Sequence, residues 1–229
     1  MSVFFRRRGK ASVLDDNFAN NSWEAIIAAC QSGRVPDSWA VGNSKAMTIN
    51  GTDYQIDIIG KNHDTYTAGG TAPLTFQMHD CYGTKHAMNS SDTNSGGWTS
   101  CAMRSTHLPA ILALMPTEVQ NGIREVNKLT SAGSQSATIN TTADKLFLLS
   151  EIEVFGNTSY SKVGEGNQYA YYSAGNSKVK KFNGVANDWW ERSPNGHGFA
   201  HFCYVNNSGG TDDYYRAGSS LCVAFGFCF

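Results

Sequence analysis

The chain lacks several features that would place it at once in a functional class. No apolar run reaches the roughly 18 residues that a membrane span needs, so we expect no membrane segment. No C-x-x-C spacing points to a zinc ribbon. Only 16% of the residues are charged and the formal net charge is -1, which argues against a nucleic-acid partner and against attachment to an anionic membrane.

The first ten residues also lack the order of a secretory signal peptide, because their apolar residues come before their basic ones. We therefore expect the chain to be made and folded in a cytoplasm, with its six cysteines as free or buried thiols. Glycine, with 23 residues, and aromatic side chains, at 12%, are plentiful. With frequent Ser, Thr and Asn, this composition is typical of a loop-rich protein with an amphipathic contact surface.

Two stretches have the periodicity of amphipathic helices. In SWEAIIAACQSG, apolar residues fall at i, i+3, i+4 and i+7 from Trp23, with Ser22 placed to cap the start and Gly33 to end the helix. In STHLPAILALMP, an apolar stripe begins at Leu108, and Pro109 fits a first helical turn.

Four stretches predict strands. KAMTINGTDYQIDIIG alternates on both sides of Asn50-Gly51, a pair that tolerates a type I′ turn, so it predicts a β-hairpin. LTFQMHD predicts a further strand, KLFLLSEIEVFG a buried strand with a continuation, and VAFGFCF a strand with one apolar face. We expect an α+β fold, with two helices, antiparallel sheets and long loops, in one domain over residues 21–229 preceded by an N-terminal arm over residues 1–20.

The segment from Asn195 to Cys222 lacks five residue types altogether. Its 28 residues include no Lys, Glu, Gln, Met or Trp, although these types supply about one residue in seven of the whole chain. None of the five can be reached from an asparagine codon by changes in its first two bases, and every residue type in the segment can. This restriction follows nucleotide chemistry and has no origin in folding.

In this segment and in several motifs upstream of it, the chain resembles a known family. DWWERSP, then a polar stretch holding FCYVN, then CVAFGFCF, resembles the variable region of target proteins of diversity-generating retroelements. Upstream, SWEAIIAACQSG, MTINGTDYQIDIIG, CAMRSTHLPAILALMP and LFLLSEIEVFG resemble a phage and bacterial domain family of undetermined function that often carries such a tail. In those systems a reverse transcriptase copies a template with errors at adenines, and the product replaces the end of the target gene.

The resemblance implies a C-type-lectin-like fold with a variable region at about 189–229. The frame residues it implies are Trp189, Trp190, Arg192, Phe202, Val205, Phe225 and Phe227. The diversified, ligand-binding residues it implies are Asn195, His197, Phe199, His201, Tyr204, Asn207, Thr211, Asp212, Asp213, Tyr214, Tyr215, Arg216, Ser220 and Leu221. Tyr and Arg among Ser, Gly and Asn are typical of binding surfaces.

The function implied is that of a non-enzymatic adhesin of a phage or prophage, needing no cofactor, that recognises a bacterial surface protein or glycan. Its expected place is the virion, to which the N-terminal arm would attach through other virion proteins. A homotrimer is expected by analogy with lectin-like tropism proteins. Two alternatives stay open: a structural virion protein, and an oxidase like the formylglycine-generating enzymes, which share this fold and use a cysteine pair, here Cys222 and Cys228.

Three residue sets have spacings that invite a chemical role. His197, His201 and Cys203 form one set, and His79, Cys81 and His86 form another, each with a spacing that could bind a metal. We favour packing or solvent contact for both sets and expect no metal. Glu151 and Glu153 would share one face of a strand as an acid/base pair, but a solvated face, or a hydrogen bond that supports a loop, is the interpretation we favour.

Overall fold

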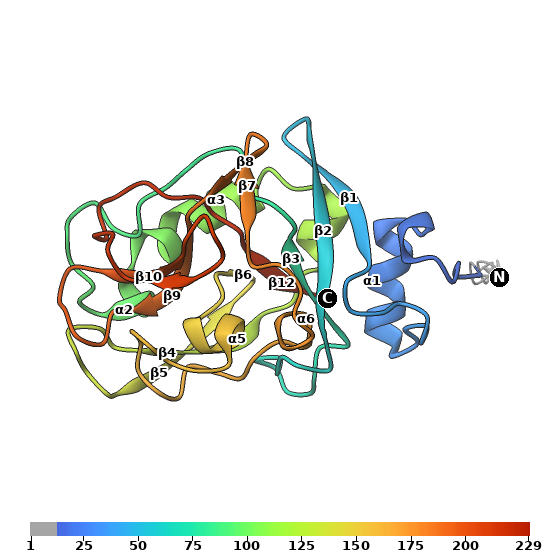
Figure 1. The fold of residues 1–229 in the computed structure, drawn as a ribbon. Coiled ribbons are helices and arrows are strands. Elements are labelled where there is room, and N and C mark those ends of the chain that lie inside the picture. Colours follow the sequence, from blue (N-terminus) through green and yellow to red (C-terminus); the bar gives the residue numbers. More distant parts are fainter. Residues whose placement is uncertain (1–12) are drawn as a thin grey trace, which may run out of the picture.

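The computed structural model describes residues 13–229 and confirms a mixed α+β arrangement with antiparallel sheets. Its largest sheet has five strands in the order β1-β2-β3-β12-β6, so the last strand of the chain lies between strands from much earlier in the sequence (Figure 1). The strands are β1 (Ser44–Ile49), β2 (Thr52–Lys61), β3 (Leu74–Met78), β12 (Gly226–Cys228) and β6 (Leu146–Phe147).

The predicted hairpin is confirmed and consists of β1 and β2. Asn50 and Gly51 have φ values of 49° and 78°, in the left-handed region that a type I′ turn requires. Ile49 pairs with Thr52 across the turn, and Met47 and Ile49 are both buried. A slip of one residue would expose this apolar face, so the alternation sets the register.

The first predicted helix is confirmed as α1 (Trp23–Ser32). The Ser22 hydroxyl accepts the backbone N–H of Ala25 at 3.2 Å, and Gly33 ends the helix in the left-handed conformation. Trp23 packs edge-on against Phe76 of β3, with ring centroids 6.0 Å apart. The helix thereby joins the core of the large sheet.

Part of the expected N-terminal arm is packed into this domain. A single turn of 3-10 helix, η1 (Phe18–Asn20), precedes α1, and Phe18 is buried. Its ring stacks on Phe76 with centroids 6.1 Å apart and meets Trp39 edge-on at 5.4 Å. The packed domain therefore begins before residue 21, which corrects the boundary we expected. Residues 1–12 of the expected arm lie outside the described part of the chain.

The final strand, β12, is buried on both faces. Phe227 stacks on Phe76 with ring centroids 5.2 Å apart, while Cys228, which points to the other side, is equally inaccessible. A Cβ atom added at Gly226 would lie 2.8 Å from the Phe147 ring, so neighbouring side chains fill the space there. The expectation of one apolar face is wrong because β12 is a central strand, and central strands pack on each side.

The predicted strand across KLFLLSEIEVFG is wrong over most of its length. Only Leu146 and Phe147 pair, as β6, and the chain then enters α5 (Glu151–Phe155). The Ser150 hydroxyl accepts the Glu153 backbone N–H, and the Glu153 carboxylate accepts the Ser150 backbone N–H. This capping box starts a helix and outweighs the apolar run that suggested a strand.

The second predicted helix is present but shorter and irregular. A π-helix, η2 (Met103–His107), leads directly into α3 (Leu108–Leu112), with Pro109 in its first turn. We expected two helices, and the described residues contain further short helices of four to six residues besides α5. Sequence periodicity does not reveal helices of this length. These are α2 (Gly97–Ser100), α4 (Thr117–Gly122) and α6 (Ala170–Ser173). Every helix within residues 13–229 is too short or too polar to cross a bilayer.

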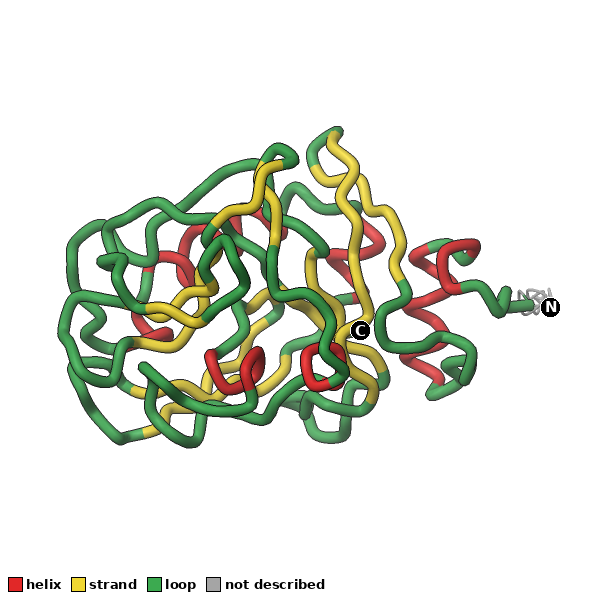
Figure 2. Tube along the Cα trace, in the orientation of Figure 1, coloured by secondary structure: helices red, strands yellow, loops and turns green. Residues whose placement is uncertain are grey.

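The part of the molecule far from α1 is built from smaller sheets joined by long loops (Figure 2). One three-stranded sheet has the order β11-β10-β9, and β4-β5 and β7-β8 each form a two-stranded sheet. The strands are β9 (Trp189–Pro194), β10 (Phe202–Val205), β11 (Thr211–Asp212), β4 (Val126–Ser131), β5 (Ile139–Asp144), β7 (Lys180–Phe182) and β8 (Val185–Asn187). The expectation of long loops is confirmed.

Candidate ligand-binding face

The segment 195–222 forms the loops around β10 and β11, at the end of the molecule far from α1 (Figure 1). Its two halves lie side by side, because His201 and Arg216 form a β-bridge and the Ala217 N–H donates to the Ala200 carbonyl at 2.7 Å. Asn195 closes the first loop by donating its backbone N–H to the His201 carbonyl at 3.0 Å. These backbone hydrogen bonds hold the two halves of the segment together without using its exposed side chains.

A hollow of about 610 Å³ opens between these loops. It is lined by His201, Asp213, Tyr214, Tyr215, Arg216 and Ser219. The two tyrosine rings stand edge to face with centroids 5.7 Å apart. Five of the six lining residues are among those that we predicted for ligand binding. The hollow combines aromatic surface with a carboxylate, an imidazole and a guanidinium, and such a mixture binds polar and apolar groups together.

The structure places eleven of the fourteen predicted ligand-binding residues at the surface. Six are exposed: His197, Phe199, Asn207, Tyr214, Arg216 and Ser220. Five are half-buried: His201, Thr211, Asp212, Asp213 and Tyr215. Phe199 is 61% and Tyr214 is 78% exposed, and large apolar side chains so exposed are typical of contact surfaces. The Arg216 guanidinium lies 3.5 Å from the Asp92 carboxylate, and both side chains are largely in solvent.

The other three predicted residues, Asn195, Tyr204 and Leu221, are buried. The Asn195 side chain accepts the His197 backbone N–H at 2.6 Å and so shapes the first loop. The Tyr204 ring packs edge-on against Trp190, with centroids 6.2 Å apart. Leu221 exchanges backbone hydrogen bonds with the segment after β3. These three residues support the face from below and are not part of its surface.

Thr211 is half-buried because it reaches a carboxylate beneath the loops. Its hydroxyl donates to Glu151 at 2.7 Å. The same carboxylate accepts the backbone N–H groups of Ser159, Tyr160 and Ser161 at 2.8 to 3.2 Å. Glu151 therefore ties three backbone segments together, which is the loop-supporting role we allowed for one of the two glutamates. The other interpretation that we favoured, a solvated strand face for the two glutamates, is wrong because Glu151 and Glu153 are both buried.

The seven predicted frame residues are all completely buried: Trp189, Trp190, Arg192, Phe202, Val205, Phe225 and Phe227. The indole N–H of Trp190 donates to the His86 carbonyl at 2.9 Å, and that of Trp189 donates to the Lys178 carbonyl at 2.9 Å. Each ring is thus fixed both by packing and by one directional bond.

Arg192 is the electrostatic centre beneath the face. Its guanidinium forms an ion pair with both oxygens of Glu153 and donates to the carbonyls of Leu148 at 2.9 Å and Glu165 at 2.8 Å. Glu153 in turn binds the Lys128 ammonium at 2.8 Å. A charge without water must be surrounded by such partners, so this network leaves little freedom to β9 and α5.

Two further buried carboxyl groups lie in the same region. Burial raises the pKa of Glu165 to about 7, although hydrogen bonds from Ser193 and from the Ser131 backbone oppose the shift. Burial and the nearby carboxylates of Glu151 and Glu165 raise the pKa of Glu191 well above its ordinary value. Both oxygens of Glu191 are without a hydrogen-bond partner among the described residues. Burial without a hydrogen-bond partner therefore favours the neutral form of the Glu191 carboxyl group.

The residue sets that suggested metal binding do not come together. His197 is exposed while Cys203 is fully buried in β10. In the other set, the His79 imidazole hydrogen bonds to Asp57 at 2.7 Å and His86 stacks on His107 with ring centroids 4.3 Å apart. Within the described residues 13–229, we find no group of three or more His, Cys, Asp or Glu side chains placed to hold a metal.

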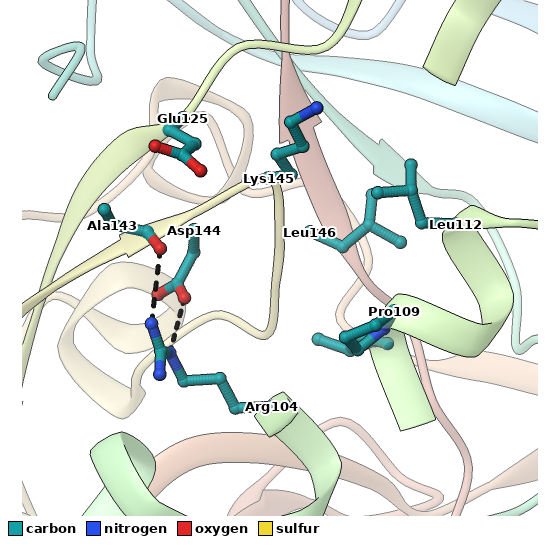
Figure 3. Close-up of a pocket in the computed structure, with 9 residues that line it drawn as sticks. Arg104, Pro109, Leu112, Glu125, Ala143, Asp144, Lys145 and Leu146 are labelled. Carbon is teal, nitrogen blue, oxygen red and sulfur yellow. Dashed lines mark hydrogen bonds and ion pairs between the residues drawn. The ribbon is translucent and has the colours of Figure 1, made fainter. Parts of the chain in front are cut away.

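A second hollow, of about 240 Å³, lies between α3 and the end of the β4–β5 hairpin (Figure 3). Arg104 crosses it to donate to Asp144 at 2.6 Å and to the Ala143 carbonyl at 3.2 Å. Glu125 and Lys145 stand at its rim, and leucine side chains form an apolar wall. Its nine lining residues, all in the described chain, include no Ser, Cys or His that could act as a nucleophile. It contains no residue of the segment 195–222.

A comparison with protein families gives one result. The model of a family described as Domain of unknown function (DUF6273) matches residues 74–225. No curated protein and no solved structure matches the chain. The matched stretch runs from β3 to the residue before β12 and includes six of the seven frame residues, all but Phe227, and the loops above them.

Proposed function

The chain belongs to the DUF6273 family, and from that premise we propose that it is a hypervariable ligand-binding protein, diversified by a retroelement, that acts as a phage adhesin on a bacterial surface ligand. The observation that carries the proposal is a separation within one segment. Residues 195–222 draw only on residue types reachable from asparagine codons, and 19 of the 28 are exposed or half-buried, while the residues on each side are buried.

This separation is what a diversified surface needs physically. Substitutions of exposed side chains usually change the free energy of unfolding by about 0.5 kcal/mol or less, whereas truncation of a packed Phe or Trp costs about 3–5 kcal/mol. A surface can therefore be randomised only where its side chains contribute little to stability. Tyr214, at 78% exposure, fits the first class, and Trp190 and Phe227, which are fully buried, fit the second.

The chemistry of the hollow suits a bacterial surface protein or a glycan. Tyr214 and Tyr215 offer rigid aromatic faces with low conformational entropy, and Asp213, His201 and Arg216 offer directional hydrogen bonds beside them. The protein acts by binding and not by catalysis. A C-type-lectin-like topology, a homotrimer and a place in the virion, with attachment to other virion proteins through the N-terminal residues that precede the packed domain, complete the proposal.

The flanking DNA tests the diversification directly. We expect a reverse transcriptase gene and a second, imperfect copy of the last part of this gene, with adenines at codons for exposed residues such as Tyr214 and Arg216. The codons for Trp190 and Phe227 should be identical in both copies. Absence of the second copy, or adenine differences concentrated at the codons for buried residues, would refute the proposal.

Binding to intact cells of bacteria related to the one that carries the gene tests the adhesin role. Tyr214→Ser and Phe199→Ser remove exposed aromatic surface from the face, whereas Val185→Ser removes a similarly exposed side chain, at 66%, from the β7–β8 hairpin. We expect at least a tenfold loss of cell binding for either aromatic variant and no change for the control. Equal binding by all three proteins would favour the structural virion protein instead.

The oxidase alternative receives no support from the geometry of its two cysteines. The Cys222 thiol lies 3.5 Å from the Asn187 side chain, whereas the Cys228 thiol lies 3.7 Å from Asp64 and 3.5 Å from Thr75. The two sulfur atoms therefore have separate surroundings, and a mechanism that uses them as a pair has no site here.

A further inference from the structure

The segment that follows β2 lies antiparallel to β4, and this register sets Asp64 opposite Lys128. Tyr66 and Val126 form an antiparallel bridge, and backbone N–H···O bonds of 2.9 and 3.0 Å flank it on both sides. Partner positions move in opposite directions along antiparallel strands, so the residue two before Tyr66 faces the residue two after Val126. These residues are Asp64 and Lys128, and both are buried.

The two side chains meet inside a buried cluster. The Lys128 Nζ atom lies 2.8 Å from Asp64 Oδ1, and it also lies 2.8 Å from Glu153 Oε1. The Phe147 ring centroid is 4.1 Å from the same Nζ atom. The Tyr169 hydroxyl lies 3.1 and 2.9 Å from the two Asp64 oxygens. A nitrogen nucleophile, a carboxyl group and a second carboxylate are thus held together in an arrangement that needs little further movement to react.

The two carboxyl groups differ in their other partners. The Arg192 guanidinium pairs with both oxygens of Glu153, and this positive charge keeps Glu153 as the carboxylate, which an amine does not attack. Besides Lys128, Asp64 receives hydrogen bonds from uncharged groups, the Thr75 hydroxyl at 2.6 Å and the Tyr169 hydroxyl. Such donors can stabilise the oxyanion that forms when an amine attacks a carboxyl carbon. Asp64 is therefore the electrophile of the cluster, and Glu153 is placed to carry a proton.

The charges of the cluster favour a reaction that removes two of them. Burial opposes ionisation of Asp64, but the Lys128 charge and hydrogen bonds from Lys128 and Thr75 lower the pKa of its carboxyl group to about 2. The pair is therefore an ammonium and a carboxylate. An amide between Lys128 and Asp64 would remove one charge of each sign. The pair of Glu153 and Arg192 would remain, so the buried charges would still balance.

A hollow of about 150 Å³ opens beside the three side chains. Asp64, Lys128 and Glu153 all line it, together with Gly166. A Cβ atom added at Gly166 would lie 2.9 Å from Glu153 Oε1, so the glycine keeps the space beside this carboxylate open. The hollow is polar and large enough to receive a water molecule that leaves the cluster.

We propose that Lys128 and Asp64 form an intramolecular isopeptide bond, an amide between Nζ and Cγ, within the folded chain. The first proton passes along the hydrogen bond from Nζ to Asp64, which leaves a neutral amine beside a neutral acid. The amine attacks the carboxyl carbon. Glu153 then takes a second proton from the nitrogen and gives it to the departing hydroxyl group, the C–O bond breaks, and water leaves. In sum, one ammonium and one carboxylate give one amide and one water, and no oxidant or reductant takes part.

The bond would join two positions that are 64 residues apart in the sequence. It would fix the segment after β2, a strand of the large sheet, to β4, a strand of the β4-β5 hairpin. Neither residue belongs to the segment 195–222, so the bond would be the same whatever side chains the loops of that segment carry. This inference does not depend on the proposed function, because it rests on the strand register and on the contacts of the buried cluster.

The intact mass of the native chain, measured after folding and then denaturation under reducing conditions, tests the proposal. We expect a mass lower by one water, about 18 Da, than the sequence requires. Trypsin cannot cleave after an acylated Lys128, so digestion should leave residues 62–85 joined to residues 125–145. An unchanged mass after prolonged incubation of the folded protein would overturn the proposal. A water loss that maps to any other site, including an amide between Lys128 and Glu153, would overturn it as well.

Variants assign the roles of the three side chains. Asp64→Ala should keep the full mass, and Glu153→Gln should form the bond about a hundredfold more slowly, because it removes the proton carrier. Lys180→Gln is the matched control. It replaces another buried lysine, whose ammonium donates to the His79 carbonyl at 2.9 Å, and it should lose water as the native chain does. Tryptophan fluorescence shows which variants are folded, and the native mass decides the question even where a variant folds poorly. Water loss by Asp64→Ala, or an undiminished rate in folded Glu153→Gln, would contradict the proposed mechanism.

Discussion

Tyr204 and Tyr214 provide the sharpest test of the division between face and frame. Both are tyrosines of the segment 195–222, and both were predicted to bind ligand. The structure separates them, because Tyr204 is 4% exposed and Tyr214 is 78% exposed. We predict that Tyr204→Ala strongly destabilises the protein and that Tyr214→Ala leaves its stability nearly unchanged.

The magnitude follows from burial. A buried aromatic side chain removes roughly 150 Å² from water, worth about 4 kcal/mol at 25 cal/mol per Å². Tyr204 also contacts the rings of Trp190 and Tyr215, with centroids 6.2 and 4.9 Å away, so its removal leaves a cavity between aromatic groups. We expect a loss of about 3–5 kcal/mol for Tyr204→Ala and a change within about 0.5 kcal/mol for Tyr214→Ala.

Urea unfolding followed by tryptophan fluorescence measures both variants, with thermal unfolding as a second readout. For a chain of this size, a loss of 3–5 kcal/mol lowers Tm by roughly 10 °C. Cell binding provides the opposite readout, because Tyr214→Ala should lose binding while keeping its Tm. A Tyr214→Ala variant that loses more than about 2 kcal/mol, or a Tyr204→Ala variant that loses less than about 1 kcal/mol, would contradict the separation of face and frame.

Three further predictions concern the buried charges. Because the pKa of Glu165 is raised to about 7 in the folded protein, its contribution to stability is fully present below about pH 4.5 and is lost as the pH rises through 7. The loss amounts to about 3 kcal/mol. Glu165→Gln should remove this part of the pH dependence of the unfolding free energy, which urea unfolding between pH 5 and 8 measures. Burial and nearby carboxylates raise the pKa of Glu191 well above its ordinary value, so Glu191→Gln should raise Tm relative to the native chain, more at pH 8 than at pH 5. An equal gain at both pH values would show that Glu191 does not titrate differently in the folded state. Arg192→Met leaves Lys128 as the ion-pair partner of the Glu153 carboxylate and should cost about 3–5 kcal/mol. Arg192→Lys should recover little of this loss, because an ammonium cannot span the carboxylate and the two carbonyls, and full recovery by Lys would refute this account.

Local patterns predicted the local structure well. The Asn50-Gly51 pair specified its turn, and Ser22 and Gly33 specified the ends of α1, because each depends on the backbone preferences of one or two residues. The same kind of signal was overlooked at Ser150, where S-x-x-E marks a helix start inside an apolar run. A stricter use of the capping pattern would have placed Glu151 and Glu153 on a helix.

The candidate face was predicted in part. The restricted residue types of 195–222 delimited the segment, and His201, Asp213, Tyr214, Tyr215 and Arg216 do line one hollow. Exposure within the segment could not be predicted, because it depends on which side chains meet the frame. The roles of the buried acids were also out of reach, since Glu165 and Glu191 have no motif around them and their pKa values depend on burial by distant segments.

The sequence by itself determined the α+β class, the hairpin, the first helix and the limits of the unusual segment, because these follow from residue periodicity, turn chemistry and codon-accessible residue types. The tertiary structure alone decided that β12 lies inside the sheet and that Tyr204 supports the face while Tyr214 forms it. These outcomes depend on which strands and side chains meet in the folded protein, and such contacts are set by the packing of the whole chain, which no local pattern contains.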